Sequence, residues 1–134
     1  MSTSSTAQRG IDLVINELAV RGIPAERVSG TRRNEVRGVH PVLGHLILQI
    51  KTRTAGTWQG STTVADVNPE RSDNRFVLFV DLADDKPDYY VVPEWWFQLD
   101  VHRELIDYLA RHPGLRTSTH HAIPTSRIKQ WHAK

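Results

Sequence analysis

The stretch FVLFVDL, residues 76–82, constrains the fold most strongly because it is a continuous run of β-branched and aromatic residues. Such a run is typical of a strand that is buried on both faces. The turn-like ADDKPD follows, and YYVVP at 89–93 returns as a second apolar arm, so the two runs predict a β-hairpin. We therefore expect a sheet that is covered on both faces.

Amphipathic helices are predicted on either side of this hairpin in the sequence. Between residues 8 and 21 the apolar positions follow helical spacing, and Gly22 and Pro24 end the pattern. Between residues 94 and 111 a second helix places large side chains on one side: Trp96, Val101, Leu105, Tyr108 and Leu109. A last short helix is expected after Pro124.

Three strands are expected between the first helix and the hairpin. They cover residues 25–29, 31–40 and 46–51, and HPVLGH at 40–45 joins the last two as a turn. Residues 52–75 lack periodicity and are predicted to form a long loop. This order predicts a single α+β domain at 8–134 with a mixed central β-sheet flanked by helices, after a disordered N-terminus at 1–7.

Charge is segregated along the chain although the net charge is only +2. Residues 21–53 hold seven Lys or Arg against two Glu, a net +5, whereas residues 54–110 hold four basic against eleven acidic residues, a net −7. The basic block suits a polyanion such as nucleic acid, or it is simply a solvated basic surface. The chain has no cysteine, no long apolar run and no apolar signal core, so no membrane association and a cytoplasmic location are expected.

The stretch LILQIKTRT, residues 46–54, combines an apolar strand with polar side chains. Because side chains alternate, Gln49 and Lys51 share one face and Leu48 and Ile50 the other. A half-buried Lys is costly unless it is paired, so an anion or a metal-bound phosphate is a candidate partner. Glu35, on the preceding strand, shares this face if opposed residue numbers sum to 86, and faces away if they sum to 85.

An acid on the first helix, a hairpin and a Q-x-K strand together resemble the PD-(D/E)XK nuclease superfamily. The sequence is most similar to the Q-x-K variant of Mrr-type restriction nucleases, and QIKTR, VDL and YYVVPE also resemble a group of small uncharacterised actinobacterial proteins. The resemblance covers roughly residues 8–110. It implies a restriction-endonuclease-like fold.

The resemblance also implies roles for individual residues in DNA cleavage. Lys51 would orient the attacking water or stabilise the transition state, while Gln49 and the carbonyl of Ile50 would bind Mg²⁺. Glu17 matches the helix acid of some members. The Asp of the first motif is missing, since no Asp lies between Leu13 and Ala65, and Glu35 is a possible substitute.

Three functions stay open from the sequence. The first is a Mg²⁺-dependent nuclease in which Arg32, Arg33, Arg37 and Arg53 hold DNA phosphates and Trp58 stacks on a base. The second is a catalytically inactive nucleic-acid-binding module, which the missing Asp favours. The third is a protein-interaction module or homodimer, which the acidic central block favours. Each residue also has a structural alternative: Trp58 can cap the core, Glu17 can be solvated, and Glu35 and Lys51 can be an ion pair.

Overall fold

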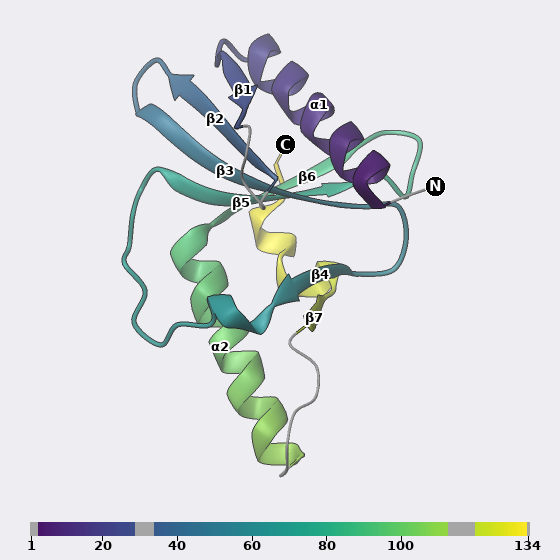
Figure 1. Cartoon of the computed structure of the whole chain (residues 1–134), viewed down its shortest axis with the longest axis vertical. Helices are drawn as coiled ribbons and strands as arrows, with labels where there is room; N and C mark the ends of the chain where they lie inside the picture. The colour runs from purple at the N-terminus through teal and green to yellow at the C-terminus, as the bar shows by residue number, and fades with distance from the viewer. Residues whose placement is uncertain (1–2, 29–33, 113–119, 134) are drawn as a thin grey trace.

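The computed structural model describes residues 3–28, 34–112 and 120–133, and Figure 1 shows its arrangement. It forms one small α+β domain whose elements are, in order, α1 (Thr3–Val20), β1 (Ala25–Arg27), β2 (Glu35–His40), β3 (Gly44–Arg53), β4 (Trp58–Ser61), the 3₁₀ helix η1 (Thr62–Val64), β5 (Arg75–Asp81), β6 (Asp88–Pro93), α2 (Glu94–Arg111), β7 (His120–Ile123) and the 3₁₀ helices η2 (Thr125–Arg127) and η3 (Lys129–Trp131).

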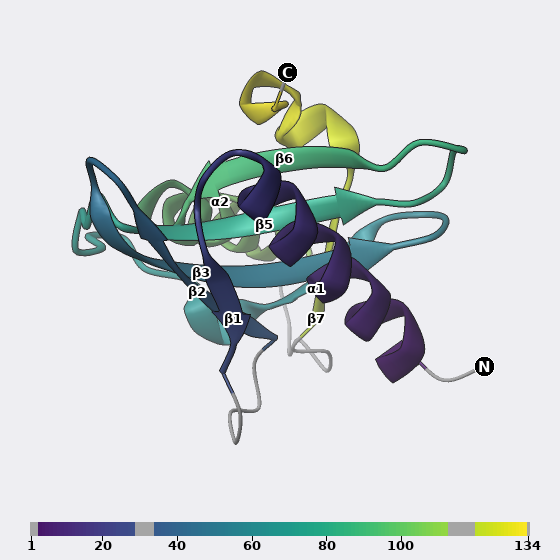
Figure 2. The ribbon, with the colours of Figure 1, turned by 90° about the horizontal axis from the view of Figure 1, so that it is seen from above.

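The main sheet has five strands in the order β1-β2-β3-β5-β6. It is mixed, as predicted, because β3 and β5 run parallel while the other neighbouring pairs are antiparallel. Seen from above, β3 and β5 lie side by side in the middle (Figure 2). The side chains at 77–80 of β5 are all buried, which confirms the strand that the FVLFVDL run predicted.

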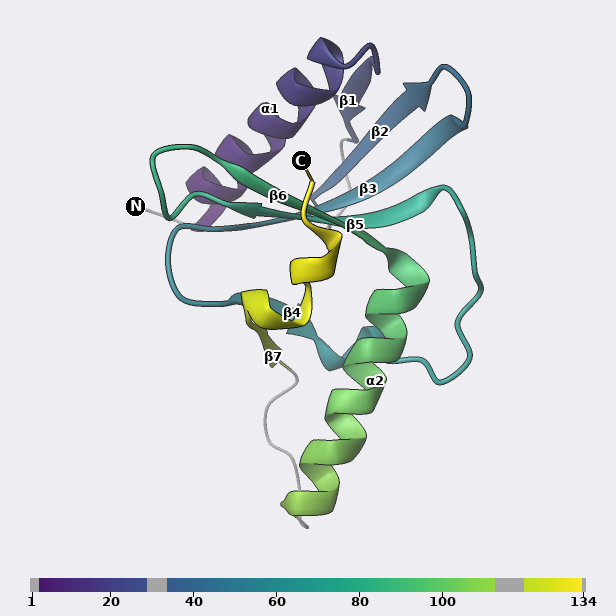
Figure 3. The same ribbon diagram turned by 180° about the vertical axis from the view of Figure 1, so that it is seen from behind.

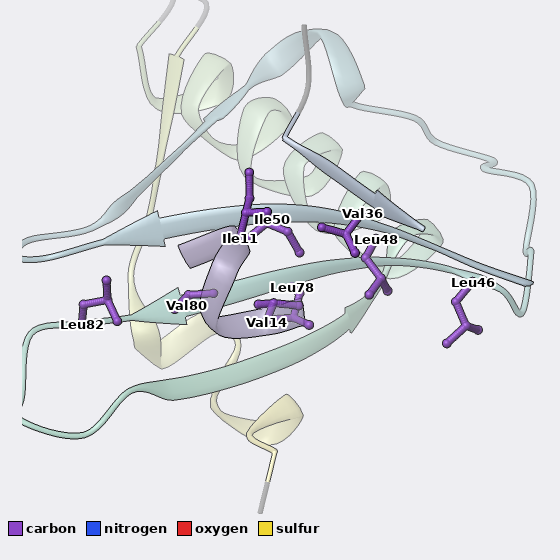
Figure 4. Close-up of a cluster of buried hydrophobic side chains, with 9 residues drawn as sticks. All are labelled: Ile11, Val14, Val36, Leu46, Leu48, Ile50, Leu78, Val80 and Leu82. Carbon is purple, nitrogen blue, oxygen red and sulfur yellow. The ribbon is translucent and has the colours of Figure 1, made fainter. Parts of the chain in front are cut away.

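Each face of the sheet carries its own core. On one face α1 packs against β2, β3 and β5 through an aliphatic cluster, shown in Figure 4. On the other face the apolar side chains of β5 and β6 pack against α2 and against the small antiparallel sheet of β4 and β7. Figures 1 and 3 show these layers from opposite sides. The sheet is therefore flanked by helices on both faces, as expected.

Three predictions about local structure differ from the structure. Residues 3–7 form the first turns of α1, rather than a disordered terminus. The expected loop at 52–75 contains β4 and η1, and the short helix expected after Pro124 takes the form of two 3₁₀ helices, η2 and η3, preceded by strand β7. For the last two regions the cause is that β4 pairs with β7, a strand far away in the sequence, and this pairing organises both of them. Among the described residues, neither helix is long and apolar enough to cross a bilayer.

Gly10 lies where α1 crosses β3, and we expect that its replacement by Ala destabilises the fold. A Cβ at this position would lie 1.9 Å from Oγ1 of Thr52 and 2.9 Å from its Cβ and Cγ2. Gly→Ala in a helix normally stabilises by about 1 kcal/mol. Here the new methyl group overpacks the contact with Thr52, so we expect the free energy of unfolding to fall by roughly 1–3 kcal/mol rather than rise. Denaturant unfolding of wild type and Gly10→Ala measures this change in the free energy of unfolding.

The control for this prediction is the double variant Gly10→Ala, Thr52→Ala. It removes the two Thr52 atoms beyond Cβ that crowd the new methyl group, so it should recover part of the loss. A Gly10→Ala variant that is more stable than the wild type would show that α1 does not approach β3 this closely.

Candidate functional site

The β2–β3 hairpin turns at residues 41–43, between the opposed pair His40 and Gly44. Gly44 has a φ of 79°, a left-handed conformation that glycine adopts without strain. Nδ1 of His40 accepts hydrogen bonds from the backbone N–H groups of Val42 and Leu43, both at 3.0 Å. This three-residue turn fixes the register of the two strands.

In this register the numbers of opposed residues sum to 84, so Glu35 lies directly opposite Gln49. Neither sum considered from the sequence was correct. An even sum nevertheless keeps Glu35, Gln49 and Lys51 on one face of the sheet, the face that α2 covers. The hairpin therefore brings three of the predicted site residues together.

The charged groups of this face have contacts within the protein. Oε2 of Glu35 lies 3.0 Å from Nε of Arg37, which is two residues along the same strand. Nζ of Lys51 donates to the carbonyl oxygen of Gln59 in β4, at 3.1 Å. Lys51 thus bridges the main sheet and the small sheet, and Glu35 is engaged by an arginine.

A cleft of about 670 Å³ opens beside the second half of β3. Its lining is rich in amide, hydroxyl and ammonium groups, from Asn34, Gln49, Lys51, Thr52, Thr54 and Gln59. The first turns of α1 form part of its wall through Thr6 and Ala7. The positive end of the α1 dipole therefore borders the cleft, and its first turn has no acidic residue.

Arg53 was predicted to hold phosphate, but its guanidinium is engaged inside the protein. Nη2 lies 2.7 Å from Oδ2 of Asp81 and donates to Oγ1 of Thr125 at 2.8 Å. Nη1 donates to the carbonyl oxygen of Gly56, and the guanidinium lies over the ring of Trp58. This arginine is a structural tie between β3, β5 and η2.

Trp58 was predicted either to stack on a base or to cap the core. It is only 2% exposed, and its Nε1 donates to the carbonyl oxygen of Val80 at 3.1 Å. Its ring packs edge-on against Phe79 and Tyr90. A side chain this buried has no free face for a base, so the core interpretation is confirmed and the stacking interpretation was wrong.

The contacts of Asp81 predict a loss of stability in acid. Burial alone would raise the pKa of Asp81, but hydrogen bonds from Arg53 and from the Ala83 N–H, with the Arg53 charge, lower it below 3.8. The ionised Asp81 carboxylate therefore stabilises the folded state fully above its unfolded-state pKa, and this stabilisation is lost as pH falls through its lower folded-state pKa. We expect the stability gap between wild type and Asp81→Asn to narrow below about pH 4.

Denaturant unfolding at a series of pH values measures this gap. Asp107→Asn is the matched control, because the Asp107 carboxylate is 59% exposed and forms an exposed pair with Arg111. A gap that stays constant through the acid range would contradict the role given to Asp81.

Glu17 lies away from the cleft, on α1 and the opposite face of the sheet. It pairs with Arg21 one turn later, with 3.0 Å between Nε and Oε1. Burial and then the charge of Glu17 raise the pKa of Tyr89, on the strand face that α1 covers. Glu17 therefore does not join Gln49 and Lys51, and its predicted catalytic role was wrong.

The donor set of the predicted metal site fits a divalent cation poorly. Gln49 and the Ile50 carbonyl are neutral, and the one carboxylate, Glu35, is paired with Arg37, whose charge repels a cation. Across residues 3–28, 34–112 and 120–133, no group of three or more His, Asp or Glu could hold a metal ion. Because Mg²⁺ is usually bound by one or two carboxylates together with water and phosphate, the expected Mg²⁺ site stays a prediction.

Of the other arginines predicted to contact phosphate, only Arg37 lies among the described residues. Arg37 is 61% exposed on β2, so it can reach a ligand. Arg32 and Arg33 lie outside the described residues, and their role stays a prediction.

A second pocket, which was not predicted from the sequence, adjoins the first. It has a volume of about 220 Å³ and lies between η1, the start of α2 and strands β3 and β5. Gln49 lines both pockets, and Asp66, Glu94 and Gln98 join it in the second. No local sequence pattern predicts this pocket, because its polar residues come from a strand, an irregular segment and a helix.

Exposed apolar side chains gather at two places away from these pockets. One is the β2–β3 turn, with Val42 and Leu43, and the other is the second half of α2, with Ile106, Tyr108 and Leu109. That half of α2 extends away from the sheet in Figure 1. A protein partner or homodimer stays a prediction.

Comparisons with protein-family models, curated proteins and solved structures find no significant match to this chain. The likeness to the PD-(D/E)XK superfamily therefore continues to rest on its short motif and on the order of the elements around it.

Proposed function

We propose that this protein binds nucleic acid, with DNA as the expected partner, in the cleft beside β3 on a nuclease-like scaffold. The observation that carries the proposal is that Gln49 and Lys51, the two polar residues of the Q-x-K motif, both line the polar cleft. Hydroxyl, amide and ammonium groups are the side-chain donors that contact phosphate oxygens. The start of α1 adds the favourable end of a helix dipole on the same wall.

Binding without cleavage fits the side chains better than catalysis does. The amide of Gln49 can both donate and accept hydrogen bonds to a phosphate or a base. Lys51 supplies positive charge for a phosphate without a metal ion. A Mg²⁺-dependent phosphodiesterase is the second candidate, which the Q-x-K motif alone favours. Its weakness is that Glu35 is paired with Arg37.

Replacing Lys51 by Ala is expected to weaken DNA binding by several-fold and to reduce the slope of log K against log salt by about 1, because one phosphate contact is lost. Fluorescence anisotropy with duplex and single-stranded DNA at several salt concentrations measures both. The matched control is Lys86→Ala, an exposed lysine on the β5–β6 loop outside the cleft. It should bind like wild type.

Two outcomes would contradict the proposal. Failure of the wild type to bind either form of DNA at low salt would remove nucleic-acid binding altogether. Plasmid cleavage in Mg²⁺ or Mn²⁺ that Lys51→Ala abolishes would show that the second candidate, the phosphodiesterase, is correct.

A further inference from the structure

The second pocket has walls and a rim of different chemistry. Val77 and Phe97, which are 1% and 2% exposed, belong to the buried core and present apolar surface. The rim carries the half-buried carboxylates of Asp66 and Glu94 and the amide groups of Gln49 and Gln98. An apolar pocket with a few convergent polar groups is the usual form of a site for a small ligand.

Most of the hydrogen-bonding capacity of this rim is unused. Within the described part of the chain, the side chains of Gln49, Glu94 and Gln98 make no hydrogen bond or ion pair. Only one oxygen of Asp66 is used, by the N–H of Asn68 at 2.9 Å. Several acceptors therefore face the pocket without a donor from the protein.

Two carboxylates in one small pocket define the ligand chemistry. Ionised carboxylates only accept hydrogen bonds, so the ligand must present hydrogen-bond donors, such as N–H groups. The volume of about 220 Å³ lies below the roughly 300–1,000 Å³ of sites for drug-sized ligands, so it suits one compact ring system. Nucleobases with an amino group meet both conditions, since Asp and Glu accept from the amino group of cytosine and Gln pairs with adenine.

We infer that this pocket binds an amino-bearing nucleobase, unstacked from a strand whose backbone lies in the cleft beside β3. Gln49 lines both pockets, so a strand held by Lys51 lies next to the entrance for one of its bases. In this role the motif glutamine reads a base through its amide group, while Asp66 and Glu94 accept from the amino group. The inference rests on the proposed function and adds a base preference to it.

Short oligodeoxycytidine and oligodeoxyuridine at neutral pH test the inference, because uracil has a carbonyl oxygen where cytosine has its amino group and carries its N–H donor at N3 instead. Wild type should bind the cytidine strand at least about five-fold more tightly, the lower end of what one paired base edge contributes. Glu94→Gln and Asp66→Asn should bring the two affinities within two-fold and leave uridine binding unreduced. Glu70→Gln, an exposed acid of the same segment outside the pocket, should keep the preference.

The outcomes separate this inference from the proposed function. Equal binding of both strands by wild type would overturn the base pocket and leave nucleic-acid binding intact. If neither strand binds, NMR titration with cytidine and uridine decides: shifts of the Gln49 and Gln98 side-chain amides with cytidine alone support the pocket for a free base. Absence of those shifts overturns it together with the proposed function.

Discussion

Replacing Trp58 by Ala is expected to cost about 3–5 kcal/mol of unfolding free energy, the range for removing a large buried aromatic side chain. The indole fills the core beneath the small sheet, between Phe79 and Tyr90, with ring centroids 5.3 and 5.9 Å away. The variant also leaves the carbonyl of Val80 without the indole N–H. Because a domain of this size is stable by about 5–15 kcal/mol, the variant should be close to unfolding.

Trp58→Phe and Trp95→Ala are the control variants. Circular dichroism during guanidinium unfolding measures the stability of all three tryptophan variants. Trp58→Phe keeps an aromatic ring but loses the hydrogen bond, so we expect a smaller loss of about 1–3 kcal/mol. Trp95 is only half-buried and stacks with the exposed Arg71, so its replacement should cost about 1 kcal/mol or less. A Trp58→Ala variant of normal stability with weakened DNA binding would restore the base-stacking role.

Local patterns sufficed for the elements that form the main sheet and its helices. The boundaries expected for α2 agree with the structure, because its helical spacing, the preceding proline and the following His-Pro mark both ends. The FVLFVDL run likewise identified β5, since a strand buried on both faces must be apolar at successive positions. These features depend only on neighbours in the sequence.

Pairing over long sequence distances could not be predicted in the same way. The strands WQGS and HHAI have the composition of loops, and they become strands because they pair with each other. The burial of Trp58 follows from that pairing, so its role was undecided from the sequence. The position of Glu17 depended on which face of the sheet α1 covers, and the second pocket gathers residues from η1, α2, β3 and β5.

The hairpin register shows how much a single turn decides. The parity of the sum of opposed residue numbers determines whether Glu35 faces Gln49 or the α1 core. The structure places the bend at residues 41–43, with His40 as acceptor for two backbone N–H groups. The face of the candidate site therefore depends on turn chemistry several residues away from it.

Replacing Arg53 by Met is expected to destabilise the protein by roughly 3 kcal/mol, the lower end of the range for breaking a buried ion pair. The Arg53 and Asp81 side chains are 15% and 14% exposed, so the variant leaves the Asp81 carboxylate with little access to water. It also removes the donors to Gly56 and Thr125 and the cation over Trp58. The methionine keeps an apolar stem, which limits the cavity.

A double-mutant cycle with Asp81→Leu isolates the pair from the packing. Because removing both charges leaves no buried ion alone, the double variant should be more stable than Arg53→Met, with a coupling energy of about 1–3 kcal/mol. Arg111→Met is the matched control, since its pair with Asp107 is exposed and should contribute less than about 0.5 kcal/mol. Additive single effects at Arg53 and Asp81 would show that this ion pair does not join β3 to β5.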